Sequence, residues 1–283
     1  MRKLAHWLWP LLFVAPLAAN AADDVNKEAP PPSASTPQHR LLNDSFRFSL
    51  GGFRAESTTE ARLSPAGGGA GADVNFEDML GLNEKKLVGE ASLYWRFTER
   101  WRLDLGYWSL NRNGTRTMST DVEWGGNTYP IGTTVDSNFK ISDLRAAVGY
   151  SFFRRPDKEL GVGFGLHRTG LEASLNAASI GATSATSQSV TAPLPFITVY
   201  GNFALTDSWA VALRSDWLSL SYDKYAGGIR ATAIDFVYQP FAHWAFGFGV
   251  HSLTLHLDVN NPSSQLQARL VFQGPAAFMS FSY

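Results

Sequence analysis

Apolar and polar residues alternate along most of the chain after residue 44. In one clear example Leu144, Ala146, Val148, Tyr150 and Phe152 occupy every second position. Successive side chains of a β-strand point to opposite faces, so this period predicts strands with one apolar and one polar or small face. No segment has a sustained helical period or the length of apolar sequence that a membrane helix needs. We predict ten strands, at residues 45–62, 84–97, 101–121, 132–153, 159–176, 189–204, 208–222, 227–240, 243–259 and 265–283.

The breaks between these strands alternate in length. The short breaks are 98–100, 154–158, 206–208 and 240–243, and the mostly longer ones are 64–81, 123–130, 177–188, 223–228 and 260–264. Bacterial outer-membrane barrels have short periplasmic turns and longer surface loops. Aromatic residues, which favour a membrane–water interface, gather at the short breaks: Phe97, Trp101, Phe152, Phe153, Phe203, Trp209, Tyr238, Phe241 and Trp244.

The chain ends in Phe278-Met279-Ser280-Phe281-Ser282-Tyr283, with apolar residues at alternate positions before a terminal aromatic. This ending resembles the C-terminal insertion signal of Gram-negative outer-membrane proteins. Over residues 44–283 the pattern is similar to the small outer-membrane β-barrels, OmpA-like in the broad sense. The resemblance implies an all-β fold, a closed antiparallel up-and-down transmembrane β-barrel. We expect ten strands, with eight or twelve as alternatives, because an even count returns the C-terminus to the periplasm.

The same resemblance implies an integral protein of the Gram-negative outer membrane. Its expected partners are outer-membrane lipid, lipopolysaccharide and, through Phe281 and Tyr283, the barrel-assembly machinery. The formal net charge of −1 gives no electrostatic footprint for nucleic acid. The absence of cysteine excludes a disulfide framework. We expect a monomer without a cofactor.

The first 43 residues differ from the rest in composition. Arg2 and Lys3, an apolar run over 4–17 and the Ala19-Asn20-Ala21 cleavage pattern predict a signal peptide at residues 1–21. Residues 22–43 contain Pro30-Pro31-Pro32 and predict a disordered periplasmic leader. The barrel is then expected to take residues 44–283.

The polar faces of the predicted strands line the lumen if the apolar faces meet lipid. Ten charged residues fall on those faces: Arg47, Glu90, Arg96, Arg102, Asp104, Asp143, Arg145, Arg214, Asp216 and Asp235. Unpaired charges in a narrow ten-stranded barrel are costly, so this balanced set favours an ion-pair network that fills the lumen. A selective pore lining is the alternative, although a pore usually carries one sign in excess at its constriction. The leading hypothesis is a non-enzymatic barrel that serves envelope integrity, surface interaction or slow passage of small solutes.

Two stretches, GVGFGLH at 161–167 and AFGFGVH at 245–251, are near repeats. No helix follows the glycines, so they do not form a phosphate loop. We interpret them as equivalent strands with inward glycines. Aligning strands on their short turns places His167 and His251 in the lumen at the level of Asp216. A proton relay, a pH-sensitive pairing and a metal site are alternatives, but a hydrogen-bonded packing role is favoured and no metal is expected.

Known outer-membrane enzymes provide a test of the sequence. Outer-membrane phospholipase A and PagL-type lipid A deacylases carry a strand-borne His-x-Ser, and no histidine here has a serine two residues later. Omptin proteases place acidic residues and a histidine at the extracellular rim. His256 with Asp258, and Asp121 with Glu123, resemble that arrangement in kind only. We predict no enzymatic activity, with an omptin-like or lipid-modifying hydrolase as the alternative.

The long break at 64–82 contains Gly67-Gly68-Gly69 and then Phe76, Met79 and Leu80 at helical spacing. A mobile loop is favoured, and a single helical turn folded over the mouth of the barrel is the alternative.

Overall fold

The computed structural model describes residues 36–65, 72–119, 121–124, 127–179, 182–222, 225–260 and 264–283. Residues from Thr36 to Tyr283 form one folded unit. The predicted signal peptide and residues 22–35 of the predicted leader lie outside the described residues. Among the described residues, no helix is both long and apolar enough to cross a membrane.

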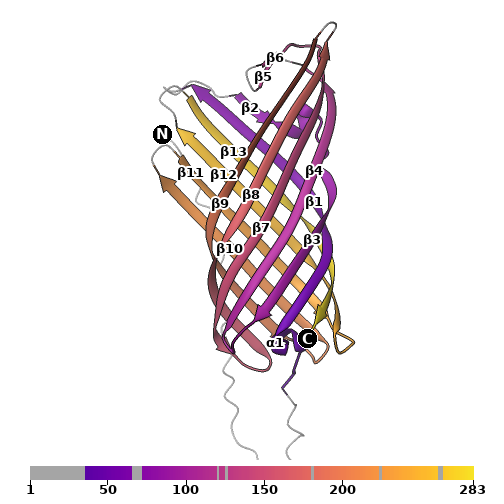
Figure 1. Ribbon diagram of the computed structural model, residues 1–283, viewed down its shortest axis with the longest axis vertical. Coiled ribbons are helices and arrows are strands. Elements are labelled where there is room, and N and C mark those ends of the chain that lie inside the picture. The colour runs from indigo at the N-terminus through magenta and orange to yellow at the C-terminus, as the bar shows by residue number, and fades with distance from the viewer. Residues whose placement is uncertain are drawn as a thin grey trace, which may run out of the picture. The chain divides into compact units, whose positions relative to one another are not determined.

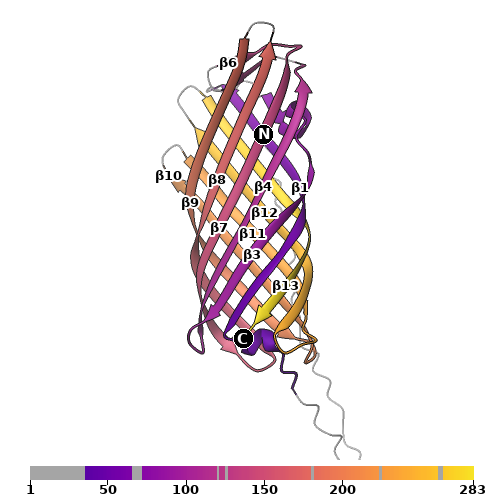
Figure 2. The same ribbon diagram turned by 45° about the vertical axis from the view of Figure 1, so that its right-hand side comes forward.

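Ten long strands form a closed antiparallel barrel (Figures 1 and 2). In ring order they are β1 (Phe46–Pro65), β3 (Lys85–Arg96), β4 (Trp101–Thr117), β7 (Thr134–Arg154), β8 (Lys158–Ser179), β9 (Ala182–Ala204), β10 (Trp209–Tyr222), β11 (Tyr225–Tyr238), β12 (Trp244–Asn260) and β13 (Ser264–Ser282). β13 pairs with β1 from Ser282↔Arg47 to Ser264↔Pro65, which closes the ring. Where the ring is closed, neighbouring strands satisfy one another's backbone groups. Above this level β9 continues beyond β10, with which it pairs only from Ile197 to Ala204. The predicted fold class and the count of ten strands are confirmed.

The barrel is taller on one side. β10 and β11 have 14 residues each, whereas β7, β8 and β9 have 21, 22 and 23. Because a tilted strand needs roughly 9–11 residues to cross a membrane, the upper part of the tall side exceeds a membrane span (Figure 1). The predicted loop at 177–188 is corrected here, because β8 continues to Ser179 and β9 begins at Ala182, and the two strands pair over this range.

Four short elements join the strands. β2 (Ala72–Asn75) pairs with β1, and α2 (Phe76–Leu80) follows it directly. β5 (Val122–Trp124) and β6 (Asn127–Tyr129) form a hairpin between β4 and β7. Residues 76–80 form a helical turn, so the alternative that the sequence analysis favoured less is correct for them. Asn75 caps this helix, because its side-chain oxygen accepts a hydrogen bond from the Asp78 amide at 3.0 Å.

A fifth short element, α1 (Arg40–Asn43), precedes β1 and lies within the range assigned to the leader. Its Leu41 and Leu42 are buried at the short-turn end of the barrel, where they pack with Ala210, Val237 and Ala245. Burial of this leucine pair stabilises an ordered start of the barrel unit. Residues 36–43, which the sequence analysis assigned to the leader, therefore belong to the same folded unit as the barrel.

The outward faces of the strands carry an apolar band. Leu144, Phe164, Ile197, Phe236 and Phe248 are all exposed there. Exposed aromatic residues at the short turns border the band: Phe97, Trp101, Phe152, Trp209, Tyr238, Phe241 and Trp244. An apolar surface of this extent with an aromatic girdle is typical of a barrel surrounded by lipid.

The glycine-rich repeats have a packing role inside the barrel. A Cβ on Gly161 would lie 2.1 Å from the Tyr200 ring, and one on Gly247 would lie 2.1 Å from the Phe278 ring. Both aromatic side chains come from a neighbouring strand and occupy the space that the glycine leaves. The repeats are thus equivalent strands with inward glycines, as the sequence predicted.

Candidate functional site

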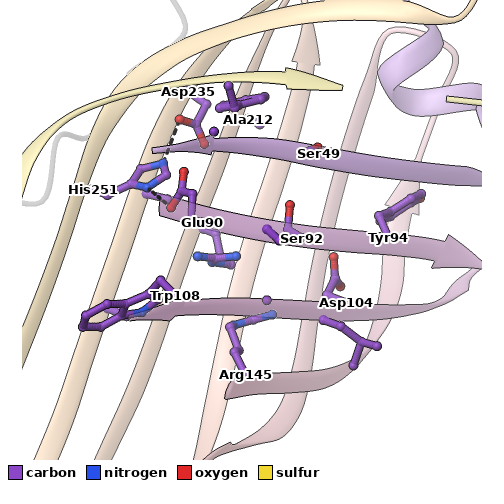
Figure 3. Close-up of a pocket in the computed structure, with 18 of the residues that line it drawn as sticks. Ser49, Glu90, Ser92, Tyr94, Asp104, Trp108, Arg145, Ala212, Asp235 and His251 are labelled. Atoms are coloured by element: carbon purple, nitrogen blue, oxygen red, sulfur yellow. Dashed lines mark hydrogen bonds and ion pairs between the residues drawn. The ribbon is translucent and has the colours of Figure 1, made fainter. Parts of the chain in front are cut away.

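The candidate site is a cavity of about 220 Å³ inside the barrel (Figure 3). Its charged lining comprises ten of the twelve residues predicted to face the lumen: Arg47, Glu90, Arg102, Asp104, Asp143, Arg145, His167, Arg214, Asp235 and His251. The other two, Arg96 and Asp216, are also buried. The side chains divide into three clusters.

The first cluster is centred on Asp216, which is fully buried. Arg145 donates to both of its oxygens, from Nε at 2.7 Å and from Nη2 at 3.0 Å. Arg214 Nε and His167 Nε2 lie 3.7 and 3.6 Å from Oδ2. His167 Nδ1 also lies 2.7 Å from Asp143 Oδ2. The structure therefore brings His167 and Asp216 together, as the strand alignment predicted, and adds Asp143 as the closer partner of the imidazole.

The second cluster is built on His251. Its Nδ1 lies 3.2 Å from Glu90 Oε2 and its Nε2 lies 3.0 Å from Asp235 Oδ1. Ionised carboxylates only accept hydrogen bonds, so a ring that donates to both carries a proton on each nitrogen. The sequence analysis placed His251 at the level of Asp216 without assigning it a partner, and its partners are two other carboxylates, Glu90 and Asp235.

Small residues explain how the second cluster forms across the barrel wall. Glu90 is on β3 and His251 is on β12, with β1 and β13 between them. The residues paired with them on those two strands are Gly51 and Gly274. Neither glycine has a side chain to fill the space, so Glu90 can reach His251.

The third cluster contains Glu159, which the sequence analysis missed. Arg96 Nη2 lies 2.6 Å from its Oε1, and Arg102 Nη1 lies 3.9 Å from its Oε2. Arg102 also donates to Asp104 at 2.8 Å and lies 3.4 Å from the centroid of the Tyr200 ring. The alternation of residues 161, 163 and 165 extends back to 159, so the inward direction of Glu159 was present in the sequence but was hidden by its place beside a short break.

An apolar layer fills the lumen above the cavity. Its buried members, drawn from seven strands, include Phe53, Leu110, Ile141, Ile229 and Phe272. Aromatic rings pack against one another at its lower side, where Trp108 lies 6.0 Å from both Phe53 and Phe272 between ring centroids. This layer separates the charged cavity from the tall end of the barrel.

The helix α2 packs against β1, β4 and β7 above the apolar layer. Glu77 of α2 points inward and pairs with Arg112, whose side chain is fully buried. Arg112 Nη2 donates to Thr59 Oγ1 at 2.6 Å, and the Thr59 amide donates to Glu77 Oε2 at 2.9 Å. Leu80 belongs to a second buried apolar cluster, which also contains Tyr129 of β6. Sequence reasoning missed the Arg112–Glu77 pair because it depends on the inward fold of a loop.

The helix α1 closes the opposite end of the lumen. Arg47 Nη2 donates to the Leu41 carbonyl at 2.8 Å, and Arg154 Nη2 donates to the Leu42 carbonyl at 3.0 Å. His39 precedes the helix, and its Nδ1 accepts from the Leu41 amide at 3.0 Å. Burial lowers the pKa of His39 from its ordinary value of 6.5.

The four predicted rim residues come from two separate segments of the chain. His256 faces outward from β12, opposite Gly228 and Arg269. Asp258 lies two residues further along the same strand. Asp121 accepts from the Ile131 amide at 2.8 Å in the loop between β4 and β7. Glu123 is in β5, and its side chain lies outside the described part of the structure. Since β13, β1 and β3 separate β12 from β4, the two pairs lie on different parts of the ring.

Within the described ranges, no group of three or more histidine, aspartate or glutamate side chains has the arrangement of a metal site. The three clusters contain ion pairs between protein side chains, and the cavity is bordered by both acidic and basic groups.

Comparison with known proteins shows a shared fold. No family model and no curated protein matches the sequence. The outer-membrane protease OmpT from Escherichia coli is similar in structure, with a TM-score of 0.55 and 9% identity over 86% of this chain and 98% of that chain. Lower TM-scores relate the chain to the translocator domain of the autotransporter NalP from Neisseria meningitidis (0.41; 11% identity; 81% and 88% covered) and to the toluene transporter TodX from Pseudomonas putida (0.37; 10%; 86% and 91%). The chain therefore has the fold of the small Gram-negative outer-membrane β-barrels.

Proposed function

We propose that this chain is an integral, non-enzymatic outer-membrane protein whose lumen is closed to ions, and that it serves envelope integrity or surface interaction. Its fold, its outward apolar band and its aromatic girdle support the membrane location. The observation that carries the proposal of a closed lumen is the apolar layer above the cavity.

The apolar layer is a barrier because of what an ion would have to lose there. Phe272 and Ile141 are fully buried, and Leu110 and Ile229 are 1% exposed. An ion passing between them would give up its hydration shell without receiving polar ligands, which is strongly unfavourable. α1 and α2 add a second and a third closure below and above this layer.

The charged clusters support the same proposal. Arg145 and Asp216, and Arg96 and Glu159, are almost fully buried pairs. A side chain that is held by a short ion pair is poorly suited to exchange partners with a passing ion. These pairs therefore favour a structural role in the lower lumen over a selective filter.

A planar-bilayer recording of the full chain tests the closed lumen. We expect no steady conductance from the unmodified protein. Replacing Phe272 and Leu110 together by serine should open a leak through the apolar layer, whereas replacing the outward-facing Phe236 by serine should not. Steady conductance of the unmodified protein that shifts on Arg145→Ala would overturn the proposal. Heat-modifiable migration in detergent identifies folded barrels in each preparation.

The absence of enzymatic function is tested separately. Purified protein is assayed on lipid A, phospholipid and peptide substrates, and we expect no turnover. Hydrolysis that is lost in the His256→Ala variant would refute this part of the proposal and favour a hydrolase that acts from the rim.

A further inference from the structure

We propose that the cavity is a binding site for a small zwitterion, an apolar α-amino acid of about the size of leucine, which enters from the end that α1 closes. The proposal adds a binding function to the closed barrel. It rests on a surplus cation and a surplus anion that face one cavity, on an adjacent aromatic wall and on the position of α1.

The surplus cation is Arg214. Arg145 and Arg214 share one carboxylate, and Arg145 takes both oxygens of Asp216 at short distance. Arg214 lies 3.7 Å from the same carboxylate, and its side chain is 37% exposed although it points into the lumen. The guanidinium therefore presents donors to the cavity in the planar arrangement that matches a carboxylate.

The surplus anion belongs to the second cluster. Glu90 and Asp235 carry two negative charges and share the single positive charge of His251. Each contacts the imidazole through one oxygen, so the second oxygen of each remains an acceptor at the cavity surface. A ligand ammonium has three N–H donors and no acceptor, which suits this pair of carboxylates.

The two surplus charges lie close together without pairing. Arg214 is opposite Ala233 and Asp235 is opposite Ala212 in the β10–β11 ladder, so the two charged residues are diagonal neighbours on the inner face. Diagonal neighbours of this kind have Cα atoms roughly 7–8 Å apart. In the described structure, however, Arg214 and Asp235 form no ion pair within 4.0 Å. An α-amino acid, whose ammonium and carboxylate are joined through one carbon, fits between such groups.

A buried hydroxyl lies on the other side of the cavity from the proposed charged contacts. Tyr94 lines the cavity and is 8% exposed, yet its hydroxyl has no hydrogen-bond partner in the described part of the chain. A buried tyrosine hydroxyl usually has a partner. Figure 3 shows Tyr94 on the same side of the cavity as Asp104, away from Asp235 and His251.

The aromatic wall indicates the kind of amino-acid side chain. Phe53, Trp108 and Phe272 line the cavity where it meets the apolar layer. A dry cavity of about 150 Å³ can hold benzene, so the volume of about 220 Å³ suits an aliphatic amino acid. A charged ligand side chain would be unfavourable against these rings.

The route of entry follows from the two closures. The apolar layer blocks the cavity from the tall end, whereas Leu41 of the four-residue α1 lines the cavity itself. Two arginine side chains hold the carbonyls of α1. Displacement of this short helix opens the cavity without any change in the barrel wall.

The binding test uses the folded full chain in detergent micelles and three probes in calorimetry. The probes are leucine, 4-methylpentanoate, which lacks the ammonium, and 3-methylbutylamine, which lacks the carboxylate. We expect leucine to bind at least tenfold more tightly than either of the others. No binding of leucine, or equal binding of a singly charged probe, would overturn the proposal.

Variants locate the site and the route of entry. Arg214→Gln and Asp235→Asn should each weaken leucine binding at least tenfold, whereas Arg54→Gln, on the outward face of β1, should leave it unchanged. Arg154→Gln removes a contact to α1 outside the cavity, so it should speed association and dissociation of leucine with little change in affinity. Equal affinities in Arg214→Gln and Arg54→Gln would overturn the site, and unchanged rates in Arg154→Gln would overturn the route. Heat-modifiable migration shows whether each variant is folded.

Discussion

The buried ion pair between Arg145 and Asp216 makes a quantitative prediction about stability. Arg145 makes two hydrogen bonds of 2.7 and 3.0 Å to this carboxylate, and the two side chains are 6% and 0% exposed. The Arg145→Met variant keeps much of the aliphatic volume but leaves Asp216 without its bidentate partner. Removal of one partner from a buried pair destabilises a protein by about 3–5 kcal/mol.

The remaining neighbours of Asp216 set the expected value within that range. Arg214 and His167 stay at 3.7 and 3.6 Å, so the carboxylate keeps partial compensation. We therefore expect a loss of about 3 kcal/mol, at the lower end of the range for broken buried pairs. The double variant Arg145→Met with Asp216→Leu removes the stranded charge as well. It should recover most of the loss, because apolar replacement of a whole buried pair is often neutral.

Reversible urea unfolding of the barrel in phospholipid vesicles, followed by tryptophan fluorescence, measures these differences. With a denaturant slope of about 2–3 kcal/mol/M, a loss of about 3 kcal/mol lowers the midpoint by about 1 M or more. The matched control is Lys85→Met, since Lys85 and Glu56 form a pair at 3.1 Å that is half exposed, and its loss should cost less than about 1 kcal/mol. A midpoint for Arg145→Met equal to that of the control, or a double variant no more stable than the single one, would refute the reasoning.

Three further predictions concern packing and the two closures. Gly161→Val places a Cβ 2.1 Å from the Tyr200 ring and should lower the free energy of unfolding by about 1–3 kcal/mol, measured by the same urea titration. Glu77→Gln leaves buried Arg112 without its anion, so amide hydrogen exchange in α2 should become faster than in the unmodified chain. Burial holds the pKa of His39 below 6.5, so the stability of docked α1 is full above that value and falls as the pH drops below it. Hydrogen exchange of α1, corrected for intrinsic rates, should therefore rise between about pH 7 and pH 5, and His39→Gln should remove the pH dependence.

The barrel itself could be predicted because the sequence of each strand indicates its approximate length and which of its side chains face inward. An alternation such as that over 143–152 identifies a strand and its two faces without knowledge of any other segment. The difficult regions are those in which tertiary contacts decide the structure. α1 depends on the pocket that receives Leu41 and Leu42, and the upper parts of β8 and β9 depend on pairing with each other.

The lumen residues were predictable for the same local reason, whereas their partners were not. The alternation of inward and outward side chains along a strand predicts that Arg145 and Asp216 face the lumen, and both are buried inside the barrel. The same alternation along β4 places Arg112 on the inner face together with Arg102. Its partner Glu77, however, reaches the lumen only because the loop after β1 folds inward. The alternation pattern of a strand contains no information about whether a distant loop folds into the lumen.

The repeat that ends in His167 and His251 shows where prediction from strand patterns stops. Counting from the short turns gives the height of each histidine on its strand, and the His167–Asp216 contact shows that such counting can succeed. The height of a histidine on its strand does not show toward which neighbouring strand its side chain turns. His251 contacts Glu90 because Gly51 and Gly274, on the two strands between them, have no side chains to occupy the space. Two strands with similar seven-residue segments therefore carry histidines with different partners, and those partners depend on which neighbouring strands lack a side chain at that level.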